Sequence, residues 1–183
     1  MRKLFTLALI LALCLPMTGR GETLTFQSEL LKLHVDLPEN WVQVEDPAKF
    51  AFVDPDGNGA ILIAPSDIPV TPELAESMTP EFVQAWILDE SDGGFTDVQQ
   101  LMFAKTVDED GNLYAISSCG CTVEGTPLIY THYFFSAADG TLVSVSGVSI
   151  NNDAGAVARN WFDQMFLDAV TEDVLYELMA QIQ

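Results

Sequence analysis

The sequence is poor in positive charge. It holds seven lysines and arginines against 27 aspartates and glutamates, a formal net charge of −20. A chain of this sign repels the phosphates of nucleic acids and anionic lipid headgroups, so the sequence predicts neither as a partner. The same charge favours solubility and leaves cations and basic proteins as the complementary partners.

Histidine is also scarce, with His34 and His132 as the only two. No serine stands in a G-x-S-x-G motif, and no H-E-x-x-H, phosphate loop or dinucleotide fingerprint occurs. With 27 acidic residues, pairs of carboxylates arise by number alone and indicate no active site. The sequence therefore predicts a protein that is not an enzyme and needs no cofactor.

Long apolar runs are missing except at the N-terminus. Arg2 and Lys3 precede a largely apolar run over 4–15, and the small residues Gly19 and Gly21 follow. A permanent membrane helix needs about 20 apolar residues, so this pattern predicts a cleaved signal peptide. Cleavage after Gly21 would leave 22–183 as a single exported domain without a membrane span, secreted or located in the periplasm or cell envelope.

Cys14 lies inside the apolar run. Leu13 stands where a bacterial lipoprotein signal has a small residue, so we expect no lipid anchor at Cys14. Loss of 1–21 removes three of the seven basic residues and none of the acidic ones. The mature chain would keep four basic residues: Lys32, Lys49, Lys105 and Arg159.

Four consecutive strands are predicted in the second half of the chain. They span 96–107, 113–124, 128–137 and 141–150. The breaks between them are rich in Gly, Asp, Asn and Pro and are too short for a crossover helix. Strands joined in this way form an antiparallel meander, which predicts an α+β domain around a central antiparallel sheet.

The other predicted elements extend or cover that sheet. Residues 31–37 alternate between apolar and polar, which indicates a half-buried strand with His34 on its wet face. Thr71-Pro72 and Thr79-Pro80 are helix starts. The remaining expected elements are strands at 50–53 and 60–64, helices at 72–78 and 80–90, a helix carrying Trp161 after 153, and a last helix capped by Thr171.

Cys119 and Cys121 are the most distinctive local pair, since their spacing puts both sulfurs on one face of a strand. If Gly125 and Thr126 form the hairpin loop, Cys119 lies opposite His132. Two thiolates and an imidazole are ligands for zinc or copper, so Cys119, Cys121 and His132 form a candidate soft-metal site. Two other readings stay open: a disulfide, favoured by an oxidising compartment, and inert core thiols.

The segment from Asp54 to Gly59 matches the start of an EF-hand loop, D-x-D-x-N-G, with the candidate ligands between Asp54 and Asn58. Oxygen ligands at its first, third and fifth positions would suit calcium. Pro65 stands where that loop needs a bidentate glutamate, and the flanks are strands. An ordinary hairpin turn uses the same residues, so a calcium turn remains an alternative reading.

The order of these parts resembles the superfamily of PsbP and DcrB. The resemblance covers about residues 24–170: a strand running into the P-x-x-W turn at 38–41, a strand–turn–strand at 50–64, a helix, the meander, and a closing helix with Trp161 and Phe162. It implies an antiparallel sheet between helices, a PsbP/DcrB-like α/β/α sandwich. The superfamily includes photosystem subunits, envelope proteins and an import factor that binds a small GTPase, which implies interaction rather than catalysis.

The sequence as a whole predicts an exported, non-catalytic binding or adaptor domain. Its expected partner is another envelope or extracellular protein. The alternative is a metal-binding protein that uses Cys119, Cys121 and His132, or the turn from Asp54 to Asn58.

Overall fold

The computed structural model describes residues 25–31, 33–37, 41–45, 49–91, 93–157, 159–160 and 170–182. The expected signal peptide, Cys14 and most of the expected helix carrying Trp161 lie outside the described residues. Within them, no helix is long and apolar enough to cross a membrane.

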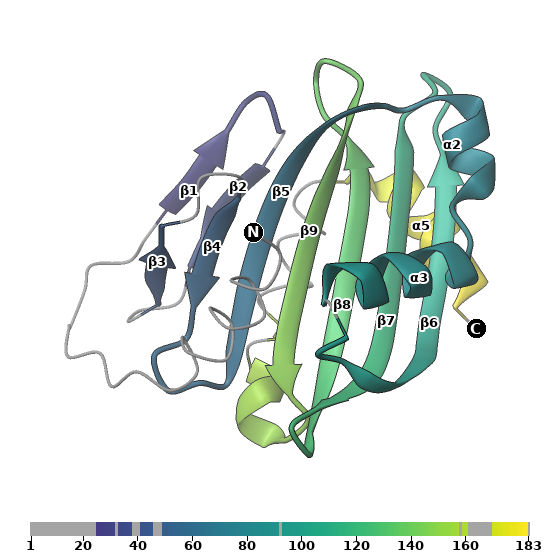
Figure 1. Cartoon of the computed structure of the whole chain (residues 1–183). Coiled ribbons are helices and arrows are strands. Elements are labelled where there is room, and N and C mark those ends of the chain that lie inside the picture. The colour runs from purple at the N-terminus through teal and green to yellow at the C-terminus, as the bar shows by residue number, and fades with distance from the viewer. Residues whose placement is uncertain are drawn as a thin grey trace.

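A seven-stranded antiparallel sheet forms the centre of the molecule (Figure 1). Its strand order is β3-β4-β5-β9-β8-β7-β6. The strands are β3 (Val42–Val44), β4 (Phe50–Val53), β5 (Gly59–Pro69), β6 (Thr96–Val107), β7 (Leu113–Val123), β8 (Thr126–Ser136) and β9 (Thr141–Ile150). The predicted meander is confirmed, because β6 to β9 are neighbours in chain order. The predicted α+β class is confirmed as well.

The turn between β7 and β8 differs from the expected one. Val123 pairs with Thr126, so Glu124 and Gly125 form the two-residue loop in place of Gly125 and Thr126. Both loop residues have positive φ, 48° at Glu124 and 83° at Gly125. Left-handed backbone at both loop positions matches the twist of a hairpin. A glutamate rarely adopts such a φ, which is why the sequence pointed to the wrong pair.

Strand β5 is longer than predicted. The sequence predicts a strand that ends at residue 64, but β5 continues to Pro69 and pairs with β9 as far as Thr141. Its register shifts between Pro65 and Pro69. A proline cannot donate to the strand ladder, and an irregularity of the register is where a sheet tolerates it.

A separate two-stranded sheet packs against the large sheet at strand β4. It consists of β1 (Thr25–Ser28) and β2 (Leu33–Asp36), with His34 opposite Gln27. The ring of Phe26 lies 4.9 Å from that of Phe50. The His34 side chain lies outside what the structure describes, so its expected surface position stays a prediction.

Two helices follow β5, and both begin as the sequence predicts. They are α2 (Pro72–Ser77) and α3 (Pro80–Glu90). The hydroxyls of Thr71 and Thr79 accept hydrogen bonds from the third residue of each helix, at 3.2 Å in both cases. A proline in the first turn costs no hydrogen bond, because its position has no partner inside the helix.

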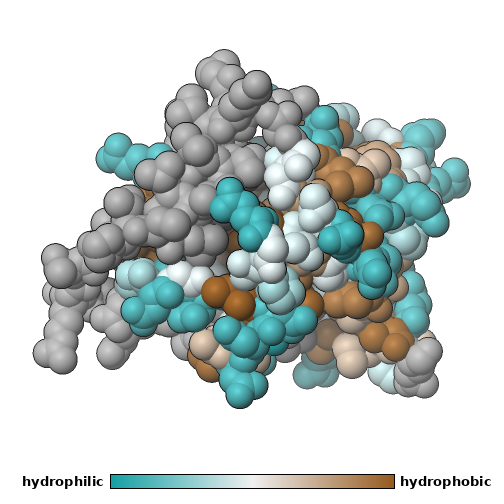
Figure 2. Space-filling model, turned by 60° about the horizontal axis from the view of Figure 1, so that its bottom comes forward, coloured by the Kyte–Doolittle hydropathy of each residue, from teal (hydrophilic) through white to brown (hydrophobic). Residues whose placement is uncertain are grey.

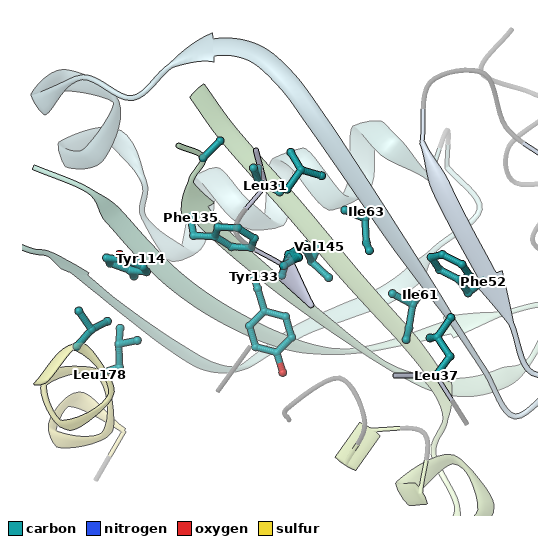
Figure 3. Packing of buried hydrophobic residues seen from close by; sticks show 14 of the residues in the cluster. Leu31, Leu37, Phe52, Ile61, Ile63, Tyr114, Tyr133, Phe135, Val145 and Leu178 are labelled. Atoms are coloured by element: carbon teal, nitrogen blue, oxygen red, sulfur yellow. The ribbon is translucent and has the colours of Figure 1, made fainter. Parts of the chain in front are cut away.

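The sheet has helices on both faces, as an α/β/α sandwich requires. In Figure 1, α2 and α3 lie in front of the sheet and α5 (Glu172–Gln181) lies behind it. Val174 and Leu178 of α5 are buried in the core of the rear face. We call this side of the sheet the α5 face, and Figure 3 shows its apolar core. The core includes Leu31, Leu37, Phe52, Ile61, Ile63, Tyr114, Tyr133, Phe135, Val145 and Leu178.

Candidate functional site

The opposite face of the sheet, which we call the α3 face, carries a buried polar row. Register places Ser117 of β7, His132 of β8 and Ser146 of β9 side by side across three adjacent strands. The first two have no exposed area and Ser146 is 4% exposed. Successive residues of a strand point to opposite faces, so the three side chains share the side on which α3 packs.

The imidazole of His132 is held by two serines of β9. Its Nε2 atom hydrogen-bonds to Ser144 Oγ and lies 3.3 Å from Ser146 Oγ. Serine hydroxyls can donate or accept, so they suit an imidazole nitrogen in either tautomer. Because a buried polar group without a hydrogen bond costs about 1–3 kcal/mol, these contacts stabilise the row.

Aromatic rings enclose the same imidazole. It stacks on the ring of Phe134 with centroids 4.1 Å apart and planes 16° from parallel. Tyr130 and Trp86 of α3 approach it edge-on, at 5.7 and 6.4 Å. His132 is therefore a core residue, closed to a substrate arriving from solvent in this structure.

A bulge in β6 adds an amide to the row. The register of β6 shifts between Gln100 and Met102. There the side-chain Nε2 of Gln100 donates to Ser117 Oγ at 3.0 Å and to the Ser118 backbone carbonyl at 3.1 Å. Its carbonyl oxygen accepts from the Cys119 thiol at 3.5 Å. Bulges re-aim side chains, and this one turns Gln100 inward to hydrogen-bond partners on β7.

Cys119 and Cys121 point into the same face as free thiols, with exposed fractions of 0% and 5%. The disulfide that the sequence left open is absent between them. Burial raises the pKa of both thiols, to about 11 at Cys121, where the neighbouring Cys119 adds to the shift. A thiol held protonated at neutral pH is a poor nucleophile, so the pair behaves as inert core residues.

The structure does not place His132 opposite Cys119. Cys119 pairs with Tyr130, and the residue opposite His132 is Ser117, because the hairpin loop lies one residue earlier than expected. Among the residues that the structure describes, no group of three or more His, Cys, Asp or Glu is arranged to hold a metal ion. Metal binding by Cys119, Cys121 and His132 remains a prediction from sequence alone.

The turn from Asp54 to Asn58 uses its carboxylate internally. Asp54 accepts from the backbone NH of Asp56 at 3.0 Å and from the Asn58 side chain at 2.8 Å. Asp108 makes the matching bonds in the loop between β6 and β7, to Asp110 NH at 3.0 Å and to the Asn112 side chain at 2.9 Å. The two hairpin turns share the same sequence pattern and the same hydrogen bonds, which supports an ordinary turn at Asp54 to Asn58 over a calcium site.

Sequence reasoning missed Gln100, Ser117, Ser144 and Ser146. A signal was present for two of them, because β9 reads Leu-Val-Ser-Val-Ser-Gly-Val, with serines at alternate positions of an apolar strand. Because side chains alternate between the two faces of a strand, both serines lie on one face, beside a polar partner. Gln100 carried no such signal, since only the bulge turns it inward.

Comparison with known proteins gives a likeness of fold only. No family model and no curated protein matches the chain. Among solved structures, a point mutant of the protein Mog1 is 13% identical with a TM-score of 0.49, covering 89% of this chain and 96% of that one. The Saccharomyces cerevisiae Ran-binding protein Mog1p is 10% identical with a TM-score of 0.48, covering 88% and 96%. A Pseudomonas aeruginosa protein of unknown function, PA94, is 12% identical with a TM-score of 0.39, covering 79% and 94%.

Proposed function

We propose that the mature chain is an exported, non-catalytic binding domain that docks on another protein of the envelope or the extracellular space. The observation that carries this proposal is the outer side of α5. There Tyr176 is 78% exposed and Met179 is 55% exposed, while Val174 and Leu178 of the same helix are buried. Tyrosine and methionine are enriched in protein interfaces, and a packed helix presents them at little cost in entropy.

Further apolar side chains are exposed elsewhere on the described surface. Figure 2 shows hydrophobic groups lying among hydrophilic ones on the side that it brings forward. The large ones outside α5 are Leu30, Phe50, Ile68, Leu88, Leu101, Val107 and Val157. Such residues are ordinary when scattered singly, so the Tyr176 and Met179 pair on one helix carries more weight than any of them.

The non-catalytic part of the proposal rests on where the reactive side chains lie. His132, Cys119 and Cys121 are the most reactive groups of the described core, and each is at most 5% exposed. The polar partners of His132 are the buried Ser144 and Ser146, and the Cys119 thiol donates to the partly buried Gln100. The arrangement supports a structural role for these side chains.

Export rests on the N-terminal signal, and its test is direct. The intact mass and N-terminal sequence of protein purified from its source should give a mature chain that begins at Glu22. A chain that retains Met1 would overturn the exported location.

Binding is tested by purification and reconstitution. Proteins cross-linked to the mature chain in an envelope fraction would each be purified and titrated against residues 22–183 by calorimetry. One partner with a saturable isotherm of fixed stoichiometry is the expected result. Failure of every purified candidate to saturate would contradict the binding function.

A further inference from the structure

The outer side of α5 is held in a fixed position by its C-terminal turn. Gln181 Nε2 donates to the Lys105 carbonyl of β6 at 2.9 Å, and Lys105 NH donates back to Gln181 Oε1 at 3.2 Å. Glu177 accepts a hydrogen bond from the Thr106 hydroxyl. With Val174 and Leu178 anchored in the core, the helix presents Tyr176 and Met179 on a rigid support.

Helical spacing determines what flanks the tyrosine. Glu172 and Asp173 lie four and three residues before Tyr176, and Met179 lies three residues after it. Residues three and four apart share one side of a helix, so the ring stands between two carboxylates and a thioether. Both acids are exposed. They also complement the positive end of the helix dipole, but that role explains neither the exposed ring nor the exposed methionine.

Acidic residues dominate the charge of the chain. The whole chain holds 27 acidic residues and seven basic ones. Two basic residues of the described surface are directed at backbone carbonyls: Lys105 Nζ donates to the carbonyls of Ala75 and Glu76, and Arg159 donates to the carbonyl of Ile150. These two cations are engaged with backbone carbonyls within the fold, and a cationic partner would supply the charge that complements the outer side of α5.

We propose that the outer side of α5, formed by Tyr176 and Met179 with Glu172 and Asp173, is a docking surface for an arginine-bearing segment of a partner protein. The proposal rests on the proposed binding function and names the chemistry of its partner. A guanidinium stacks on a tyrosine ring and donates in parallel to carboxylates, which an ammonium group cannot do. Methionine adapts to an aliphatic neighbour of that arginine.

The test is a titration of isotopically labelled residues 22–183, followed by NMR, with a short capped peptide that contains two arginines and two leucines. Shift changes should concentrate on α5, and the matched lysine peptide should bind more weakly. Tyr176→Ala should weaken binding by roughly tenfold or more, as truncation of an aromatic anchor does, whereas Tyr176→Phe retains it. Because Tyr176 is largely exposed, neither variant should alter the thermal melting curve.

A matched charge control separates this surface from bulk attraction. Glu172→Gln with Asp173→Asn should weaken binding severalfold more than Glu109→Gln with Asp110→Asn, which removes the same charge from the exposed loop between β6 and β7. Equal losses from the two double variants, or unchanged binding by Tyr176→Ala, would overturn the docking surface. Those results would leave the reconstitution with a purified partner unaffected, so the two proposals fail separately.

Discussion

The two faces of the sheet are built from alternate residues of the same strands, yet they differ in chemistry. On β8, Tyr133 and Phe135 enter the apolar core of the α5 face, whereas His132 and Phe134 enter the α3 face. The α5 face relies on close packing of large side chains. The α3 face adds a hydrogen-bonded row of Gln100, Ser117, Cys119, His132, Ser144 and Ser146.

This difference predicts two kinds of sensitivity. An apolar core loses stability in proportion to the volume removed from it. A polar row loses stability when one partner is removed and another is left buried without its hydrogen bond, and it can recover when both partners are replaced. Substitutions on the two faces should therefore follow different rules.

The largest effect is expected on the α5 face. Phe135 is 2% exposed, so Phe135→Ala should lower the free energy of unfolding by about 3–5 kcal/mol, through lost burial and the cavity that remains. Urea denaturation measures this change. The control is Leu101→Ala, because Leu101 is 58% exposed and should change stability by no more than about 0.5 kcal/mol. Similar losses at both positions would contradict the packing described for this face.

The second effect tests the polar row. His132→Phe keeps a ring against Phe134 but removes the partner of Ser144 and Ser146, and should cost about 2 kcal/mol. Adding Ser144→Ala and Ser146→Ala should recover at least half of that loss. The three substitutions would be compared in a denaturation cycle. Simple additivity, with each change lowering stability further, would show that the serines do not depend on the imidazole.

The third effect is a dependence on alkaline pH. Burial raises the pKa of Cys121 from 9.0 to about 11, so the folded state binds the thiol proton more tightly than the unfolded state. The stability that this provides is present below pH 9 and is lost as pH rises from about 9 to about 11, on the order of 2 kcal/mol. Cys121→Ala should show a smaller loss over that range. Parallel pH profiles for the two proteins would refute the assignment.

The smallest effect concerns the edge of the sheet. Strand β6 is a long edge strand, and Gln181 covers its backbone at Lys105. Gln181→Ala should cost about 1 kcal/mol, since the two hydrogen bonds are exposed to solvent. It should also speed hydrogen exchange at the Lys105 amide. An unchanged exchange rate at that amide would mean that Gln181 does not protect the edge.

Much of the fold could be predicted because its signals are local. Strands β6 and β9 have the predicted bounds, and the starts of α2 and α3 follow from Thr-Pro pairs. The length of β5 could not be predicted, because two prolines argued against a strand that an irregular register tolerates. The sequence carries no recognised signal for β3, because its three residues form a strand through pairing with β4.

The candidate site was predicted less well than the fold. The sequence correctly placed Cys119, Cys121 and His132 on one face, because a shift of two residues preserves the alternation of a strand. The sequence predicted the wrong neighbours within that face, because the position of the hairpin loop between β7 and β8 depends on a positive φ at Glu124. The serine partners of His132 come from β9, and pairing between strands sets that contact.

The most direct test of the proposed binding function is site-specific photo-cross-linking in the cells that make the protein. A photoreactive phenylalanine would replace Tyr176 in one strain and Val157, which is 60% exposed, in another. We expect one discrete protein adduct at position 176, attached within a segment that carries arginine, and no such adduct at position 157. No adduct at position 176, or the same set of adducts at both positions, would contradict the proposed binding function.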